Sequence, residues 1–189
     1  MRPGELPDKL KVGNQYHEID TDYRNVLQIV IAMNDEKLTD RDKAYICLRR
    51  LYKDISRIQR DDYQEAYEKA SEFISCGMSG DRGAPNIVSW EKDQPLIFPE
   101  INKVAGCEVR ALPYMHWWTF LGYFQAVDRE GLWGSVLTIR QKRAKGKKLE
   151  KYEKEFMSAN KSLISMKKQD KNKNRDPLKA LFDELSADE

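Results

Sequence analysis

Apolar side chains recur every three or four residues along most of this 189-residue chain, which is the spacing of one face of an α-helix. The first stripe predicts a helix that ends near Met33 and that Asp20 or Thr21 caps at its start. Thr39 precedes a second stripe, and a third ends near Gly77, a residue type suited to a helix C-terminus. The pattern predicts a mainly α fold with a single multi-helix domain.

Two stretches depart from this helical periodicity. Near the N-terminus, the pair Gly13-Asn14 separates two short stretches in which apolar and polar residues alternate, which predicts a small β-hairpin packed on the helices. Residues 78–94 are rich in Gly, Ser, Pro, Asn and Asp and have no periodicity, which predicts a long surface loop. The apolar residues that follow predict a helix that ends near Gly106 and that Pro99 either begins or kinks.

An aromatic stretch over residues 114–124 carries more apolar area than its neighbours, because each large ring offers roughly 150–250 Å² for burial. Pro113 can open a helix here. Met115 and Trp118 point away from the main apolar face, and Gly122 lies one turn after Trp118. A helix that is apolar on two sides is central in the fold or contacts a partner. The predicted core face contains Tyr114, Trp117, Phe120, Leu121, Phe124 and Val127.

Charge is segregated along the chain, although the net charge is only +2. Residues 1–139 hold 18 basic and 22 acidic side chains, residues 140–175 hold 14 and 4, and residues 176–189 hold 1 and 5. Charge and periodicity together predict four parts. These are an N-terminal segment with the hairpin (1–20), a helical core (21–140), a basic helical extension (141–166), and a flexible linker with a short amphipathic helix (167–189).

The basic extension carries a heptad-like apolar seam after a shorter helix that Gly146 interrupts. Such a seam needs a facing helix, from the same domain, from another protein or from a second copy of the chain. The final amphipathic segment is too short to be stable alone, which predicts a docking motif for the chain's own body or for another protein. The seam consists of Leu149, Tyr152, Phe156, Ala159, Leu163 and Met166, and the final segment carries Leu178, Leu181, Phe182 and Leu185.

Composition argues against several classes of protein. The longest apolar-leaning run, residues 26–33, is far shorter than the roughly 20 residues that cross a bilayer, and the first residues lack the apolar stretch of a secretory signal. We therefore expect a cytosolic protein without a membrane span. Three cysteines and two histidines follow neither a zinc nor a disulfide pattern. Cys47, Cys76 and Cys107 are expected to be buried or partly buried free thiols.

No motif in the sequence predicts an enzyme, a metal or a cofactor. Residues 20–31 open like a calcium loop but lack its glycine and its last carboxylate, and residues 80–83 lack the lysine and helix of a phosphate loop. Histidine is the residue type suited to proton transfer near neutral pH, but His116 has no Ser or Cys nucleophile and no cluster of acids near it in the sequence, so we expect it to hydrogen-bond near a helix start. Stacking of nucleobases on Trp117 and Trp118 is disfavoured by the few cations nearby.

Several motifs resemble those of a family of small bacteriophage proteins, the "gene product fifteen" family. They are residues 115–120 (MHWWTF), Ile139-Arg140, residues 145–149 (KGKKL) and, upstream, residues 19–24 (IDTDYR). The similarity covers most of residues 9–165. It implies a tail assembly chaperone of the host cytoplasm, which is absent from the mature virion. The partners that it implies are the tape-measure protein, which such a chaperone keeps soluble, and the tail-tube protein.

Binding of a protein partner is therefore the leading hypothesis, with self-association left open. A nucleic-acid-binding protein that uses the basic extension, and a structural tail subunit or adaptor, are the alternatives. The basic run from Arg140 fits a solvated helix face, contact with an acidic protein, or contact with phosphates. The candidate partner-binding residues are Met115, Trp117, Trp118, Arg140, Lys142, Arg143, Lys147, Lys148, Tyr152, Phe156, Leu181 and Phe182.

Overall fold

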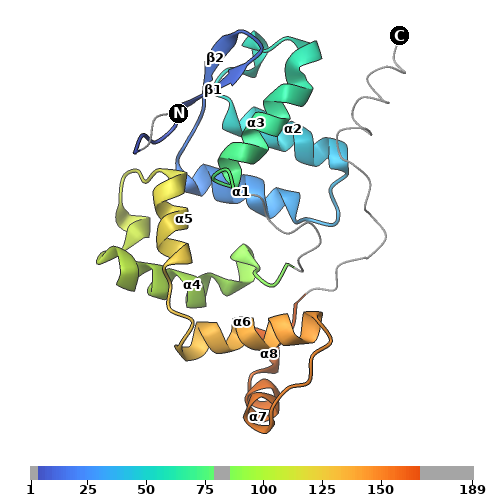
Figure 1. Cartoon of the computed structure of the whole chain (residues 1–189), viewed down its shortest axis with the longest axis vertical. Coiled ribbons are helices and arrows are strands. Elements are labelled where there is room, and N and C mark those ends of the chain that lie inside the picture. The colour runs from blue at the N-terminus through green and yellow to red at the C-terminus, as the bar shows by residue number, and fades with distance from the viewer. Residues whose placement is uncertain (1–3, 79–85, 167–189) are drawn as a thin grey trace. The chain divides into compact units, whose positions relative to one another are not determined.

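A computed structural model describes residues 4–78 and 86–166 of the chain. Those residues form eight α-helices and one two-stranded antiparallel hairpin, so the predicted mainly α class is confirmed (Figure 1). Within the described residues, the chain divides into two compact units: residues 4–78 with 114–120, and residues 86–113 with 121–166. The four-part division expected from the sequence stays a prediction.

The first unit begins with the predicted hairpin. Strands β1 (Lys9–Val12) and β2 (Gln15–Glu18) pair antiparallel, with Val12 opposite Gln15, so that only Gly13-Asn14 forms the turn. Gly13 adopts a φ of +56°, which a residue without a side chain reaches at no steric cost. Its backbone N–H also donates to Glu65 at 2.9 Å, which ties the turn to helix α3 (Tyr63–Ile74). The hairpin therefore packs on a helix, as expected for a ribbon that is marginal alone.

Three helices build most of this unit, and each carries its predicted apolar stripe. Asp22, rather than Asp20 or Thr21, caps the first helix, because its side chain accepts from the N–H of Arg24 at 2.8 Å. The Asp20 side chain instead accepts from the N–H of Asp22, two residues later in the chain. Thr39 caps the second helix, where it forms a capping box with Asp42. The helices are α1 (Tyr23–Met33), α2 (Asp40–Leu51) and α3 (Tyr63–Ile74), and α3 ends in a left-handed turn at Cys76 and Gly77.

The aromatic helix α5 (Trp117–Gln125) starts four residues later than predicted from Pro113. The backbone before it pairs with the chain ahead of α1 instead: Met115 O accepts from Tyr23 N at 3.0 Å, and Trp117 N donates to Thr21 O at 2.8 Å. Groups committed to this pairing are not available for a helical turn. Tyr114 is consequently 53% exposed and is not part of the predicted core face, whereas the Phe120 ring stacks on the buried Tyr23 ring.

In the second unit, the predicted loop over residues 78–94 is wrong in its last part. Helix α4 runs from Trp90 to Ala105 and contains Pro95 and Pro99 in its interior. Ser89 caps it by accepting from Lys92 N at 3.3 Å, and the Asp93 side chain reaches back to Ser89 N at 2.8 Å. Side-chain capping therefore fixes the start of α4, which the prolines and the loop-like composition of this stretch do not predict. The predicted end at Gly106 is confirmed by its φ of +70°.

Three more helices complete this unit, α6 (Gly131–Ala144), α7 (Lys151–Ala159) and α8 (Lys161–Ile164), and the predicted basic extension covers the end of α6 and both later helices. Both short helices pack against α6 (Figure 1). Gly146 separates α6 from α7 with a φ of +65°, as predicted. The heptad seam is not one continuous helix, because Asn160 breaks it and caps the carbonyl of Phe156 at 3.0 Å.

Candidate partner-binding surface

The two central indoles are anchored by hydrogen bonds at the end of α3. Trp117 Nε1 donates to Ile74 O and Trp118 Nε1 donates to Phe73 O, both at 2.8 Å. The last carbonyls of a helix have no partner within it, so Trp117 satisfies Ile74 O, and Trp118 adds a second donor to Phe73 O, which also accepts from Cys76 N at 3.1 Å. Trp117 is 2% exposed and Trp118 is partly exposed, and the Trp118 ring also stacks on Phe73. The prediction that Trp117 belongs to the core is confirmed.

His116 has a structural place beside these rings. Its Nδ1 accepts from Trp118 N at 3.0 Å, so the other ring nitrogen, Nε2, carries the proton that Pro7 O accepts at 3.0 Å. It therefore caps the first turn of α5, as predicted. Because both ring nitrogens are occupied and the residue is buried, His116 is not presented to a substrate.

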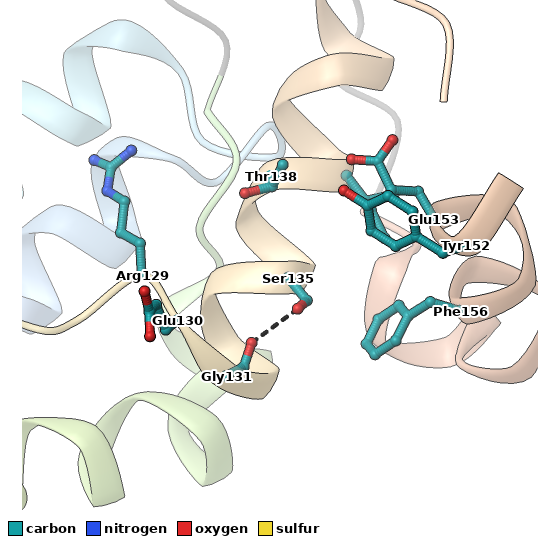
Figure 2. A pocket seen from close by; sticks show the side chains of 9 residues that line it. Arg129, Glu130, Gly131, Ser135, Thr138, Tyr152, Glu153 and Phe156 are labelled. Carbon is teal, nitrogen blue, oxygen red and sulfur yellow. Dashed lines mark hydrogen bonds between the residues drawn. The ribbon is translucent and has the colours of Figure 1, made fainter. Parts of the chain in front are cut away.

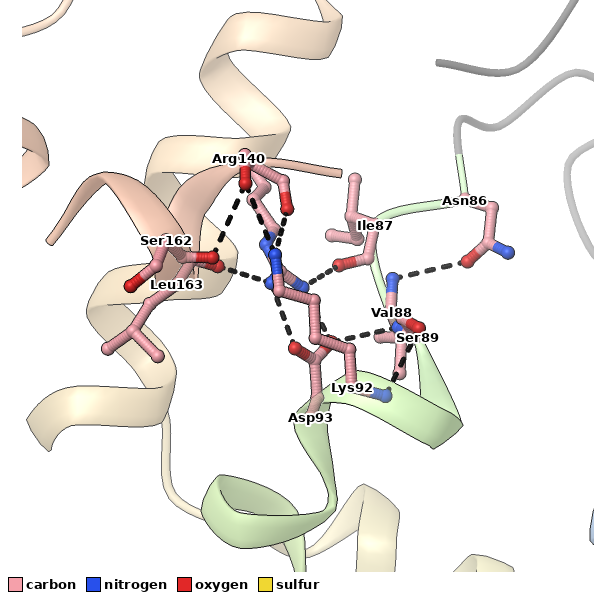
Figure 3. A network of polar contacts seen from close by, with 10 residues as sticks. Asn86, Ile87, Val88, Ser89, Lys92, Asp93, Arg140, Ser162 and Leu163 are labelled. Carbon is pink, nitrogen blue, oxygen red and sulfur yellow. Dashed lines mark hydrogen bonds and ion pairs between the residues drawn. The ribbon is translucent and has the colours of Figure 1, made fainter. Parts of the chain in front are cut away.

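Arg140 lies inside the second unit, in a buried polar network (Figure 3). Its guanidinium binds the Asp93 carboxylate through two parallel contacts of 2.6 and 2.9 Å, and both side chains are 2% exposed. The same group also donates to Ile87 O at 2.9 Å and to Leu163 O. Arg140 on α6 therefore connects α4, the segment before α4, and α8. Because its side chain is buried and paired, Arg140 presents no charge to a partner.

A second ion pair joins α6 to α7. Lys142 Nζ lies 2.6 and 2.8 Å from the two carboxylate oxygens of Glu153, which also accepts from the N–H of Glu150 at 2.8 Å. The hydrogen bond from Lys142 lowers the pKa of Glu153, and the hydrogen bond from Glu153 raises the pKa of Lys142. Glu153 is the buried residue of α7, so this pair holds the helix in place.

A groove of about 180 Å³ lies between α6 and α7 (Figure 2). Tyr152 and Phe156 project from α7 toward Ser135 and Thr138 on α6, and Ile139 supplies further apolar surface. Tyr152 is 69% exposed, the highest value among the exposed large apolar side chains of the described residues. A neutral groove with a solvated aromatic ring can hold apolar side chains of another segment. Its remaining lining residues are Arg129, Glu130, Gly131 and Glu153.

Cations follow this groove at the end of α6 and in the loop before α7. Arg143, Lys145, Lys147 and Lys148 are all exposed. Lys142 is partly exposed, but Glu153 neutralises it. The exposed cations are the ones that can attract an acidic partner before contact.

The structure thus separates the predicted partner-binding residues into groups. Exposed or partly exposed are Trp118, Lys142, Arg143, Lys147, Lys148, Tyr152 and Phe156, and of these Tyr152 and Phe156 share the groove. Met115, Trp117 and Arg140 are buried, so they are positioned to support the fold rather than to contact another molecule. Leu181 and Phe182 lie outside the described residues. Partner binding by the exposed residues stays a prediction.

Sequence reasoning missed the two acids that organise this unit. Asp93 fell in a stretch interpreted as loop, and its partner Arg140 is 47 positions away, which no periodicity links. Glu153 could have been found, because Glu150 and Glu153 have the spacing of a capping box at the start of α7. The prediction for the cysteines holds for Cys47 and Cys76, but Cys107 is exposed in the turn after α4.

Across residues 4–78 and 86–166, no three His, Cys, Asp or Glu side chains are grouped so that they could hold a metal ion. No helix in these ranges is both long and apolar enough to span a bilayer.

Comparison with known proteins gives one match. Residues 4–166 match the family model described as "Bacteriophage Gp15 protein". No curated protein and no solved structure matches the chain. The match spans both units, including the anchored indoles, the Asp93–Arg140 network and the α6–α7 groove. Because it covers most of the sequence, the chain belongs to the bacteriophage Gp15 protein family.

Proposed function

We propose that this bacteriophage protein is a non-enzymatic tail assembly chaperone that binds the tape-measure protein in the host cytoplasm and assists assembly of the tail tube. The observation that carries the proposal is the groove between α6 and α7, where the exposed Tyr152 and the half-buried Phe156 stand beside four exposed cations. Membership of a phage family supports the setting. The tape-measure and tail-tube proteins are the partners that the resemblance implies.

The chemistry of the groove suits a helical client. An amphipathic helix would place apolar side chains against Tyr152 and Phe156, while acidic residues on its flank face the cationic loop. Such a contact shields the client from self-association. The contact must also be weak enough for tube subunits to displace the chaperone.

Co-expression tests this proposal directly. We expect a tape-measure protein to be more soluble when this chain is present, and Tyr152→Ser to reduce the effect, since losing a central aromatic contact typically costs about 2 kcal/mol, or roughly thirtyfold in affinity. Tyr45→Ser is the matched control, because Tyr45 is 63% exposed on α2. A client that is equally insoluble with and without this chain would refute the proposal.

The exposed cations also favour a second candidate, binding of nucleic acid. Arg143, Lys145, Lys147 and Lys148 could neutralise phosphates, which predicts affinity that falls steeply with salt. A gel shift at about 50 mM salt decides this alternative, because phosphate-driven binding is strong there. A third role, as a structural subunit, would be favoured over the chaperone by mass-spectrometric detection of the chain in purified virions.

A further inference from the structure

The α6–α7 groove has a candidate occupant within the same chain. Residues 176–189 hold five acidic side chains and one basic side chain, whereas the end of α6 and the loop after it expose four cations, from Arg143 to Lys148, and one acid, Glu150. The segment's apolar residues, Leu178, Leu181, Phe182 and Leu185, have the spacing by which a helix places one face into a groove.

The groove itself does not repel this acidic segment. Glu153 is neutralised by Lys142 at 2.6 Å, and the formal charges of Arg129 and Glu130 cancel each other. The cationic loop, Arg143 to Lys148, is left to set the local potential. Opposite charges on the groove's edge and on the segment therefore favour their contact.

The chain can also reach the groove from where α8 ends. Ser165, directly after α8, is held by Lys92, whose Nζ lies 2.6 Å from the Ser165 carbonyl, and α8 packs on both α6 and α7. The nine residues 167–175 can span up to about 30 Å, whereas a nine-residue helix such as α7 is only about 14 Å long. A short tether also gives the segment an effective concentration on the order of millimolar.

We propose that residues 176–189 bind in cis to the groove between α6 and α7, with Leu181 and Phe182 against Tyr152 and Phe156. The segment covers the exposed ring until a client with a similar acidic, amphipathic helix displaces it. Docking in cis does not depend on the proposed chaperone function; only the competition with a client rests on it. Docking would keep the groove from binding unrelated apolar segments.

Nuclear magnetic resonance of the full chain tests the docking without any client. In the variant Leu181→Asp/Phe182→Asp, we expect the amide signals of Ser135, Thr138 and Tyr152 to shift relative to the wild type. Ala180→Asp/Ala187→Asp is the matched control, because it adds the same charge on the opposite side of the helical stripe. It should leave the groove signals at their wild-type positions.

Three results would overturn the proposal. The first is groove signals that are identical in the wild type and in Leu181→Asp/Phe182→Asp. The second is an equal response to the control variant, which would show a charge effect without docking. The third is a wild-type pattern that depends on protein concentration, which would assign the groove to a second copy's segment. If any of these results is found while the wild-type chain still raises client solubility in co-expression, this inference fails and the chaperone proposal stands.

Discussion

Removing the charge of Asp93 should destabilise the unit formed by residues 86–113 and 121–166. The variant Asp93→Asn keeps the shape of the side chain but leaves the Arg140 guanidinium, 2% exposed, without its counter-ion. Ile87 O and Leu163 O would remain as acceptors. Arg140 Nε already has no partner among the described residues, so the network holds no spare acceptor.

The expected cost follows from this geometry. Breaking a buried ion pair by removing one partner costs about 3–5 kcal/mol, and the two remaining carbonyl acceptors place Asp93→Asn near the lower end, at about 3 kcal/mol. That is a large part of the roughly 5–15 kcal/mol that stabilises a typical domain. Urea unfolding gives the free energy, and peptide-resolved hydrogen exchange should locate the loss in α4, α6 and α8.

A double variant separates the charge from the packing. In Asp93→Leu/Arg140→Met both charges are gone and apolar volume replaces them, but Ser89 N, Ile87 O and Leu163 O lose their partners, so the double variant should recover only part of the free energy of unfolding that Asp93→Asn loses. The reasoning is refuted if Asp93→Asn alone costs less than about 1 kcal/mol, or if the double variant is as unstable as the single one. Either result would mean that this pair does not hold the three segments together.

Three further measurements test other parts of the structure. Gly134→Ala should destabilise the protein by at least about 1–3 kcal/mol, because the new Cβ would lie 1.5 Å from Arg129 O. Gly122→Ala, with open space around the new Cβ, should stabilise α5 by about 0.5–1 kcal/mol. Equal shifts of the two melting temperatures would contradict this pair of predictions. Ellman's reagent at about pH 8 should label Cys107 quickly and Cys47 only on unfolding, because burial raises the pKa of Cys47 to about 12; rapid labelling of native Cys47 would disprove it. Glu153→Gln should lower the free energy of unfolding above pH 4.5, the ordinary pKa of a Glu carboxyl. The difference in stability between variant and wild type should vanish as the pH falls through the lower pKa that Glu153 has in the folded state. A stability difference that persists in acid would rule out the ion pair as its source.

Local signals made much of the fold predictable. The hairpin turn at Gly13, the Thr39 cap and the left-handed stop at Gly106 depend on neighbouring residues, so their chemistry is visible in the sequence. The start of α4 was hidden because Asp93 takes part in a contact with Arg140 across 47 positions. The start of α5 was misplaced for the same reason: pairing with residues 21–23 replaces the first helical turn.

The candidate site was only partly predictable, because sequence cannot tell an exposed apolar residue from a buried one. The indoles were expected to offer apolar surface to a partner, yet the N–H groups of both donate to carbonyls of α3, which fixes the rings against that helix. Tyr152 and Phe156 belonged to a seam that predicted a facing helix, and α6 provides one for part of their surface. The exposure of these two rings depends on how closely α6 and α7 approach each other, and contacts such as Lys142–Glu153 set that distance.

The same contact bears on the reversible binding that we propose for α7. A nine-residue helix is marginal in water on its own, and the one buried residue of α7 is the ion-paired Glu153. Its attachment to α6 therefore relies on a polar contact and on apolar rings that are only partly covered, whereas Arg140 holds α6 to α4 through a fully buried pair. A rigid wall and a weakly held wall form a groove that can adapt to its occupant. Ordering α7 around a bound helix would offset part of the binding free energy, which favours the weak, releasable contact that the proposed chaperone function requires.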